Sequence, residues 1–263
     1  MRRTRTEIDP AAFPEELRPC LLNTAVYDSS CSEEARVWYL EKDGGLFLKR
    51  MPAGMLKTDA EMTAYFHTLG LSAEVLAYVG KADADWLLTR RIPGEDCTHR
   101  RYREQPERLC DVLGETLRSL HERETSGCPV QDRLETYRAA VCRGHAQGKY
   151  EPDLFRGLWE FPSAEAAWEA AQRGMRQMKE EVLIHGDYCL PNVLLDDWRL
   201  SGLIDVGNGG VADRHIDLLW GIWTLKFNLG TGRYTERFMD AYGRALIDPE
   251  MLRCTAAMEM IGA

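Results

Sequence analysis

The pattern of hydrophobic and polar positions divides the chain into a strand-rich first part and a helix-rich second part. Four strands and one helix are predicted in the first part, with strands at 35–40, 46–49, 75–79 and 86–89 and a helix at 58–69. The first two strands flank the turn residues Lys42–Gly45, which predicts a β-hairpin. The helix places Met62, Phe66 and Leu69 on one side.

The pattern changes after Ile92-Pro93-Gly94. From there the spacing predicts helices at 106–123 and 163–178, short strands at 182–185, 193–196 and 200–205, and three helices from 213 onwards, broken near Gly230 and Asp248-Pro249. Ser163 is the expected N-cap of the second helix. The order of elements indicates an α+β fold with two lobes, a β-rich lobe at 1–92 and a mainly helical lobe at 93–263.

Composition and charge limit the classes of function. Hydrophobic residues make up 44% and charged residues 29%, and no run approaches the roughly 20 apolar residues of a membrane span. No secretory signal is predicted, because the basic start is followed by polar residues. The eight cysteines include no C-x-x-C pair, which favours reduced thiols and a cytoplasmic location.

The formal net charge is −9, which is the wrong sign for a typical nucleic-acid binder. Two interpretations stay open: a solvated acidic surface, or an acidic surface that attracts a cationic small molecule. We expect no nucleic-acid or membrane partner and a monomer or weak dimer.

Three polar residues surrounded by strand-like sequence carry the candidate chemistry. Asn192 follows Asp187 by five residues, and Asp205 follows it by eighteen. This spacing is typical of a protein-kinase catalytic loop followed by a metal-binding Asp. Taken one at a time, these residues could equally be turn formers between strands. The combination predicts phosphoryl transfer.

Phosphoryl transfer explains the residue types. Mg²⁺ prefers hard oxygen ligands, which a carboxylate and an amide carbonyl supply. We predict that Asp205 binds one metal ion, that Asn192 binds a second, and that Asp187 orients the acceptor hydroxyl or accepts its proton.

The motif resembles that of the aminoglycoside phosphotransferase family, closest in texture to the 3′-phosphotransferases. The resemblance rests on His185-Gly-Asp187, Asn192, Ile204-Asp205-x-Gly207, Ala212-Asp213 and Asp217. It extends over nearly the whole chain. It implies a bilobal protein-kinase-like fold, ATP or GTP as phosphate donor, and Mg²⁺ as cofactor.

The resemblance also assigns residues to the nucleotide site. Lys49 is the expected phosphate-binding lysine and Phe47 the ring that stacks on the base, since alternate residues of a strand share a face. Glu61 is the predicted ion-pair partner of Lys49. In the competing interpretation, Glu61 closes a capping box with Thr58.

Two further segments complete the predicted nucleotide site. The segment Ser29–Ser32 replaces the Gly-rich phosphate loop of protein kinases, and Ser32 is its candidate contact. The connector from Thr89 to Ile92 should meet the adenine edge through backbone groups. Glu33 and Glu34 are weaker candidates for the pairing with Lys49.

The remaining candidates support the loop or bind the acceptor. His185 and Asp217 should brace the catalytic loop. By position Glu160 and Glu259 resemble the acids with which the family binds its substrate, and Asp153 is a further acidic candidate. Surface carboxylates are the competing interpretation for each. Asn208 departs from the family, which often has Arg there, so the acceptor range is open.

The leading hypothesis is transfer of phosphate from ATP or GTP to a hydroxyl, expected at the 3′ position, of an aminoglycoside antibiotic, which would confer resistance. An alternative keeps the fold and changes the acceptor to choline, homoserine, a macrolide or another metabolite. A third hypothesis is a nucleotide-binding pseudokinase module, which the presence of Lys49, Asp187, Asn192 and Asp205 disfavours.

Overall fold

The computed structural model describes residues 3–31 and 35–262. The chain divides into two compact units. The first comprises Met1–Asp96, Leu194–Asp197 and Ser201–Gly207, and the second comprises Cys97–Val193, Trp198–Leu200 and Asn208–Ala263. These bounds differ from the predicted lobes 1–92 and 93–263, because two short segments from late in the chain group with the first unit.

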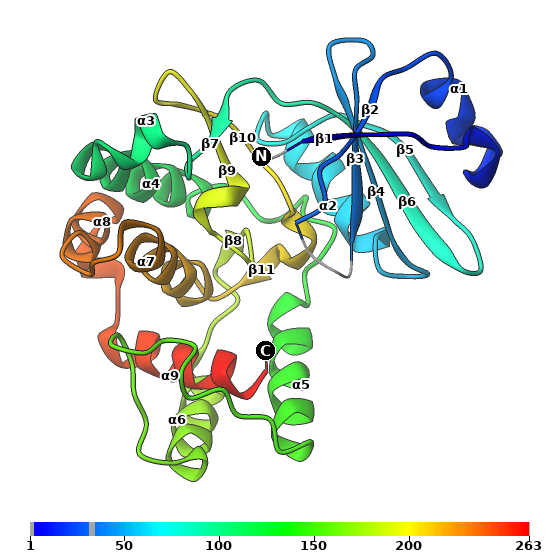
Figure 1. Ribbon diagram of the computed structural model, residues 1–263. Coiled ribbons are helices and arrows are strands. Elements are labelled where there is room, and N and C mark those ends of the chain that lie inside the picture. The colour runs from blue at the N-terminus through cyan, green and yellow to red at the C-terminus, as the bar shows by residue number, and fades with distance from the viewer. Residues whose placement is uncertain (1–2, 32–34, 263) are drawn as a thin grey trace. The chain divides into compact units, whose positions relative to one another are not determined.

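A six-stranded antiparallel sheet forms most of the first unit (Figure 1). In order across the sheet, its strands are β1 (Thr4–Thr6), β2 (Val26–Asp28), β3 (Arg36–Leu40), β4 (Leu46–Pro52), β6 (Ala84–Arg90) and β5 (Val75–Gly80). The predicted hairpin is confirmed, since β3 pairs with β4 in a register that sets Val37 opposite Lys49 and Tyr39 opposite Phe47. Asp43 and Gly44 have left-handed backbones, with φ of 51° and 85°, as a tight turn requires.

The two faces of β4 have different neighbours. Leu46 and Leu48 belong to a core with Trp86 and the N-terminal segment that contains η1 (Pro10–Ala12), η2 (Glu15–Leu17) and α1 (Arg18–Leu21). On the other face, Leu56 and Ala60 at the start of α2 (Lys57–Thr68) pack on Leu87 of β6. Phe47 and Lys49 alternate with the leucines and therefore lie on the α2 side.

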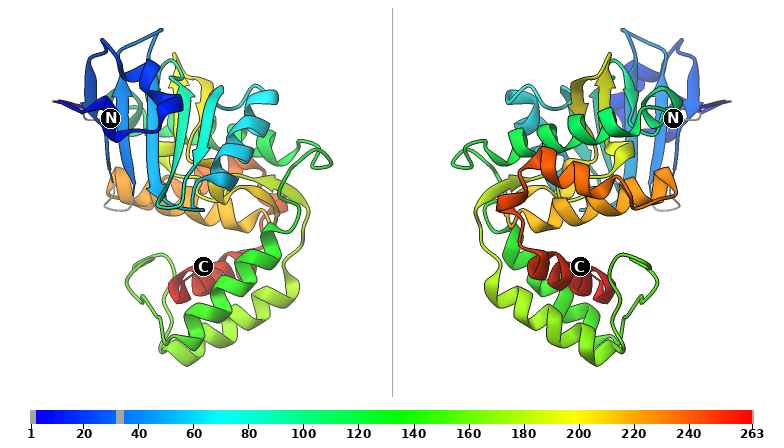
Figure 2. Two further views of the ribbon diagram at one scale, coloured as in Figure 1. Left: turned by 90° about the vertical axis from the view of Figure 1, so that its right-hand side faces the viewer. Right: turned by 90° about the vertical axis from the view of Figure 1, so that its left-hand side faces the viewer.

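Helices dominate the second unit. They are α3 (Arg100–Arg103), α4 (Pro106–His121), α5 (Arg133–Ala146), α6 (Ala164–Gln177), α7 (His215–Leu229), α8 (Thr235–Tyr242) and α9 (Pro249–Ile261), with short turns η3 (Leu190–Asn192) and η5 (Arg244–Leu246). The turn η4 (Val206–Asn208) begins in the first unit and ends in the second. Within this unit α4, α7 and α8 pack together, and α5, α6 and α9 form a second group (Figure 2).

Two small sheets contain the strands that flank the motif residues in sequence. Strand β9 (Val193–Asp196) lies between β10 (Arg199–Leu203) and β7 (Glu95–Asp96), while β8 (Val182–Ile184) pairs with β11 (Gly210–Ala212). The catalytic-loop sequence follows β8, and Asp205 follows β10. Asp187 and Asp205 therefore each follow a strand, and Asn192 directly precedes β9.

Local signals explain the helix ends. Ser163 caps α6 through a 3.2 Å bond from the Ala166 N–H, as predicted. Gly230 adopts φ 68° after α7, and Asp248 caps α9 with Pro249 in the first turn. A membrane-spanning helix would need a long apolar run, and no helix in the described part of the chain has one.

Candidate active site

A pocket of about 340 Å³ opens in the first unit on the α2 side of β4. That volume is within the range of small-molecule sites. Its lining includes four residues predicted to bind nucleotide and the predicted metal ligand, namely Phe47, Lys49, Thr89, Ile92 and Asp205. Ser29 also lines the pocket, whereas Ser32 and the candidates Glu33 and Glu34 lie outside the described residues. The pocket thus gathers strand, connector and motif residues that are far apart in sequence.

Lys49 contacts two carboxylates in this pocket. Its Nζ is 2.9 Å from Asp59 Oδ2 and 2.8 Å from Asp205 Oδ1. Burial alone would lower the pKa of the Lys49 ammonium, but the charges of Asp205 and Asp59 outweigh it and raise that pKa above its usual value. Lys49 is therefore a fixed cation, as a phosphate-binding lysine must be.

The predicted pairing of Lys49 with Glu61 is wrong. Glu61 is exposed, and its nearest cation is Lys57 at 3.9 Å. Asp59 has the pairing role because residues two positions apart in a helix point about 200° apart. The capping-box alternative is also wrong, since α2 begins at Lys57 and its N-cap, Leu56, makes no side-chain bond.

Asp205 approaches α2 through an unusual backbone. Its φ is 56°, a left-handed conformation that is uncommon for residues other than Gly. Two residues later, a Cβ on Gly207 would lie 3.1 Å from the Asp59 Cβ, a tight contact, so the close approach favours glycine. The I-D-x-G pattern thus places a carboxylate and a packing contact against the same helix.

The catalytic-loop residues lie together in the second unit. Asn192 Nδ2 donates to the Asp187 carboxylate at 2.9 Å and to its backbone oxygen at 3.0 Å. The Asp187 N–H donates to His185 Nδ1 at 3.2 Å, and the Cys189 N–H donates to the Asp187 backbone oxygen at 2.8 Å. The backbone and the side chain of Asp187 are therefore both held by hydrogen bonds.

Asp217 lies behind this loop and is fully buried. Its two oxygens accept the N–H groups of His185 and Gly186, each at 2.7 Å. This is the arrangement that a supporting role requires. His121 of α4 adds a third contact, with Nε2 3.1 Å from Asp217.

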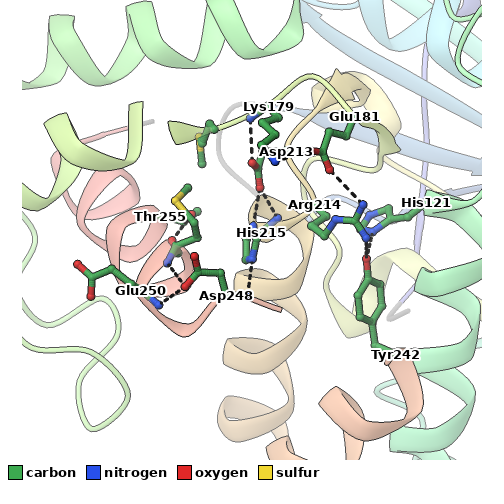
Figure 3. A network of polar contacts seen from close by, with 12 residues as sticks. His121, Lys179, Glu181, Asp213, Arg214, His215, Tyr242, Asp248, Glu250 and Thr255 are labelled. Carbon is green, nitrogen blue, oxygen red and sulfur yellow. Dashed lines mark hydrogen bonds and ion pairs between the residues drawn. The ribbon is translucent and has the colours of Figure 1, made fainter. Parts of the chain in front are cut away.

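The support continues away from the loop. His121 Nδ1 is 2.8 Å from the Tyr242 hydroxyl, which also accepts a bond from Arg214 at 3.2 Å (Figure 3). Burial lowers the pKa of His121, which keeps the ring neutral. The three helices α4, α7 and α8 therefore meet at the residue that holds the catalytic loop.

The three predicted acceptor-binding acids differ in environment. Glu259 of α9 is buried and accepts a 2.9 Å bond from the Tyr137 hydroxyl of α5. Burial raises the pKa of Glu259 to about 8. Asp153 is exposed and paired with Arg156, while Glu160 is exposed and accepts a 3.2 Å bond from the Gly157 N–H.

The segment that carries Asp153 and Glu160 begins beside α9. The Glu151 N–H donates to the Met260 carbonyl at 2.8 Å. No hydrogen bond between described residues joins either exposed acid to Glu259. The structure therefore provides Glu259 with a hydrogen-bonding partner from another helix. For Asp153 and Glu160, acceptor binding stays a prediction.

Comparison with known proteins identifies the family. Residues 32–257 match the phosphotransferase enzyme family. The chain belongs to this family. It is 40% identical over 95% of both chains to a probable aminoglycoside 3′-phosphotransferase of Lactococcus lactis subsp. lactis (strain IL1403).

Solved structures show the same fold. A type VIII aminoglycoside-3′-phosphotransferase superposes with a TM-score of 0.72 at 24% identity, covering 98% of this chain and 93% of that one. An aminoglycoside phosphotransferase APH(3′′)-Id of Streptomyces rimosus, in complex with ADP and streptomycin, gives 0.65 at 24% identity over 86% and 90%. The predicted α+β fold of the aminoglycoside phosphotransferases is confirmed.

The predicted metal ligands of this phosphotransferase, Asn192 and Asp205, suit Mg²⁺ better than a metal ion that is bound by protein side chains alone. In the described residues, no three His, Cys, Asp or Glu side chains cluster as a metal site. Both bonds from the Asn192 side chain use Nδ2, which leaves Oδ1 as the atom for a cation. Mg²⁺ usually takes one or two protein oxygens and completes its shell with phosphate and water.

Sequence reasoning missed several residues around these sites. They are Asp59 beside Lys49, His121 and Tyr242 behind Asp217, and Tyr137 beside Glu259. Asp59 had a readable signal, because it lies three residues before Met62 and seven before Phe66, on the buried stripe of α2.

Proposed function

We propose that this phosphotransferase moves the γ-phosphate of ATP or GTP to a hydroxyl of an aminoglycoside antibiotic, at the 3′ position, and so confers resistance. The observation that carries the proposal is the 40% identity over 95% of both chains to a relative named for that activity. The pocket with Phe47, Lys49 and Asp205 supports the nucleotide half.

In the proposed reaction, Phe47 stacks on the base and the connector from Thr89 to Ile92 meets its edge. Lys49, oriented by Asp59, binds phosphate oxygens. Asp205 and Asn192 would hold Mg²⁺, which would supply neutralisation of charge on the transferring phosphoryl group. Lys49 also pairs with Asp59, so the lysine would keep one anionic partner with Asp205 engaged by a metal.

Asp187 orients the attacking hydroxyl and accepts its proton as the phosphoryl group leaves the nucleotide. Its carboxylate is fixed by Asn192, and its loop is fixed by Asp217 and His185. A fixed acceptor of this kind lowers the barrier through orientation. The acids Glu259, Glu160 and Asp153 bind the ammonium groups of the substrate.

The test is turnover by the purified protein with Mg²⁺ and either ATP or GTP against kanamycin, neomycin, streptomycin, choline, homoserine and a macrolide. We expect release of nucleoside diphosphate with kanamycin and neomycin, and a 3′-phosphate in the product by ³¹P NMR. Turnover with a metabolite or macrolide alone would refute the aminoglycoside acceptor.

The Asp187→Ala variant tests the chemistry in the same assay. We expect kcat to fall by at least about a thousandfold, because the hydroxyl loses its orienting base. Nucleotide affinity should remain, since the nucleotide pocket lies in the other unit. A fully active variant would contradict the role of Asp187.

A further inference from the structure

His215, the first residue of α7, joins the start of α7 to the start of α9. Its Nδ1 is 2.6 Å from Asp213 Oδ1, and its Nε2 accepts the Asp248 N–H at 2.9 Å. Figure 3 shows the ring between Asp213 and Asp248. Asp213 and His215 are both buried, so this bridge is shielded from water.

The two bonds determine the tautomer of His215. A backbone N–H can only donate, so Nε2 is an acceptor without a proton. Nδ1 then carries the proton and donates to the Asp213 carboxylate. One ring nitrogen is thus dedicated to Asp213 and the other to the α9 start.

Asp213 gives this bridge a fixed base. Its Oδ1 also accepts the His215 N–H at 3.0 Å, and its Oδ2 accepts the Lys179 N–H at 3.0 Å. Burial alone would raise the pKa of Asp213, but the hydrogen bonds from His215 and Lys179 outweigh it and lower that pKa. The carboxylate is therefore ionised. It binds backbone N–H groups both from the segment before β8 and from the start of α7.

Asp248 is the structural start of α9. Its side chain accepts the N–H groups of Glu250 at 2.9 Å and Met251 at 3.4 Å. His215 binds the backbone of the same residue, so the N-cap is held from both sides. The first turn of α9 consequently cannot shift along α7 without breaking the His215 bond.

Glu259 lies eleven residues further along α9, at about 16 Å for a rise of about 1.5 Å per residue. It accepts a 2.9 Å hydrogen bond from the Tyr137 hydroxyl of α5. A small rotation at the start of a rigid helix therefore moves the carboxylate relative to this partner. The position of Glu259 depends on where α9 begins.

We propose that His215 is a positioning residue for the acceptor site, which acts through the Asp248 N–H to fix α9 and its Glu259. The inference rests on the proposed function, in which Glu259 binds an ammonium group of the acceptor. It assigns His215 to acceptor binding, not to phosphoryl transfer or nucleotide binding.

Three substitutions separate the two ring nitrogens. His215→Phe removes both. His215→Asn places polar atoms where Nδ1 lies but does not reach the Asp248 N–H. His215→Gln places an oxygen near the position of Nε2 and can accept that N–H.

We expect the KM for kanamycin to rise roughly five- to tenfold in the Phe and Asn variants, because one hydrogen bond is lost at the α9 start. His215→Gln should restore it to within about twofold of the parent value. In all three, kcat and the KM for the nucleotide should stay within about twofold of the parent. His145→Phe is the matched control, since His145 is exposed and its ring stacks on Trp168.

A purely structural role predicts a different pattern of KM values for kanamycin among the three variants. Anchoring of Asp213 alone would be rescued by Asn and not by Gln, and general destabilisation would lower the melting temperature without changing the KM for kanamycin. Either result would overturn the proposal.

Hydrogen–deuterium exchange provides a readout that needs no substrate. Amides of residues 250–253 should exchange faster in the Phe and Asn variants and at the parent rate in the Gln variant. If the parent phosphorylates no aminoglycoside while exchange follows this order, the proposed function fails and the positioning of α9 stands. If the parent is active and exchange is unchanged, the positioning role is refuted.

Discussion

Lys49 donates hydrogen bonds to two carboxylates, one from α2 and one from the segment after β10. Asp205 is half-exposed and Asp59 is buried, so Asp59 is the more fixed partner. Asp59→Asn should lower kcat/KM for the nucleotide by at least about tenfold, because a largely buried cation loses its permanent counter-charge. Steady-state kinetics with varied Mg-nucleotide measures this effect.

Glu61→Gln is the matched control for that substitution. Glu61 lies on the same helix and is exposed, so kcat/KM should remain within about twofold of the parent value. Equal losses in the two variants, or a loss in Glu61→Gln alone, would show that Glu61 is the functional partner after all.

The buried Glu259 should make stability depend on pH. Its pKa is raised from 4.5 to about 8 in the folded protein, so between these values the folded state binds more protons than the unfolded state. The free energy of unfolding should therefore fall as pH rises through this window and level off above about pH 8. Glu259→Gln removes this loss, because a neutral amide needs no proton.

Urea unfolding of the parent and Glu259→Gln at several pH values tests this. The two proteins should differ least at the acidic end of the window and diverge by a few kcal/mol at its alkaline end, since one pKa unit corresponds to about 1.4 kcal/mol. Glu160→Gln, at an exposed acid, should follow the parent. A constant difference at all pH values would contradict the burial effect.

For single residues, the sequence predicted the contacts within one motif. It did not predict contacts between residues that only the fold brings together. Asp187, Asn192 and His185 are close in sequence, and their hydrogen bonds follow from one loop. His121 reaches Asp217 across 96 residues, and Tyr137 reaches Glu259 across 122. No local pattern encodes such pairs, although a histidine among the buried positions of a helix indicates that a polar partner must lie nearby.

Among the elements, the turn from β8 into the catalytic loop has the strictest backbone requirement. Gly186 has φ 84°, and a Cβ there would lie 2.0 Å from the Asn208 backbone oxygen. Gly186→Ala should destabilise the protein by more than about 4 kcal/mol, since backbone strain and a backbone clash add together. Thermal or urea unfolding measures the loss.

Gly148→Ala separates these two contributions. Gly148 has φ 69°, but a Cβ there would meet nothing within 4 Å. Its cost should be only the strain of a left-handed residue, about 1–2 kcal/mol. If both variants lost the same stability, the close approach of Asn208 would not be the deciding constraint.

Element predictions succeeded where the pattern was long. Helix α4 repeats buried leucines at 109, 113, 117 and 120, and the hairpin of β3 and β4 has a clear turn. Helix α5 was missed, because its buried residues Leu134, Val141 and Gly144 are sparse among charged side chains. Strands β1, β2, β7 and β11 have two or three residues each, too few for an alternation to be recognised.

For the whole molecule, the sequence predicted two structural parts but not their membership. Segments Leu194–Asp197 and Ser201–Gly207 group with the first unit because β9 pairs with β7 and the Leu203 N–H donates to the Leu71 carbonyl. These are long-range backbone contacts that composition cannot reveal. Their effect is to place Asp205 beside Lys49, which makes the nucleotide pocket a property of one unit.

The net charge of −9 also acts on the whole molecule. A polycationic acceptor should be attracted over long distances, so kcat/KM for kanamycin should fall steadily as ionic strength rises. The useful range runs from about 0.01 M to about 0.15 M, where the Debye length falls from about 30 Å to about 8 Å. The anionic Mg-nucleotide is the internal control, since its kcat/KM should hold or rise over the same range. Parallel declines for both substrates would indicate salt inhibition of the enzyme, and a flat profile for kanamycin would show that the acidic surface serves solubility alone.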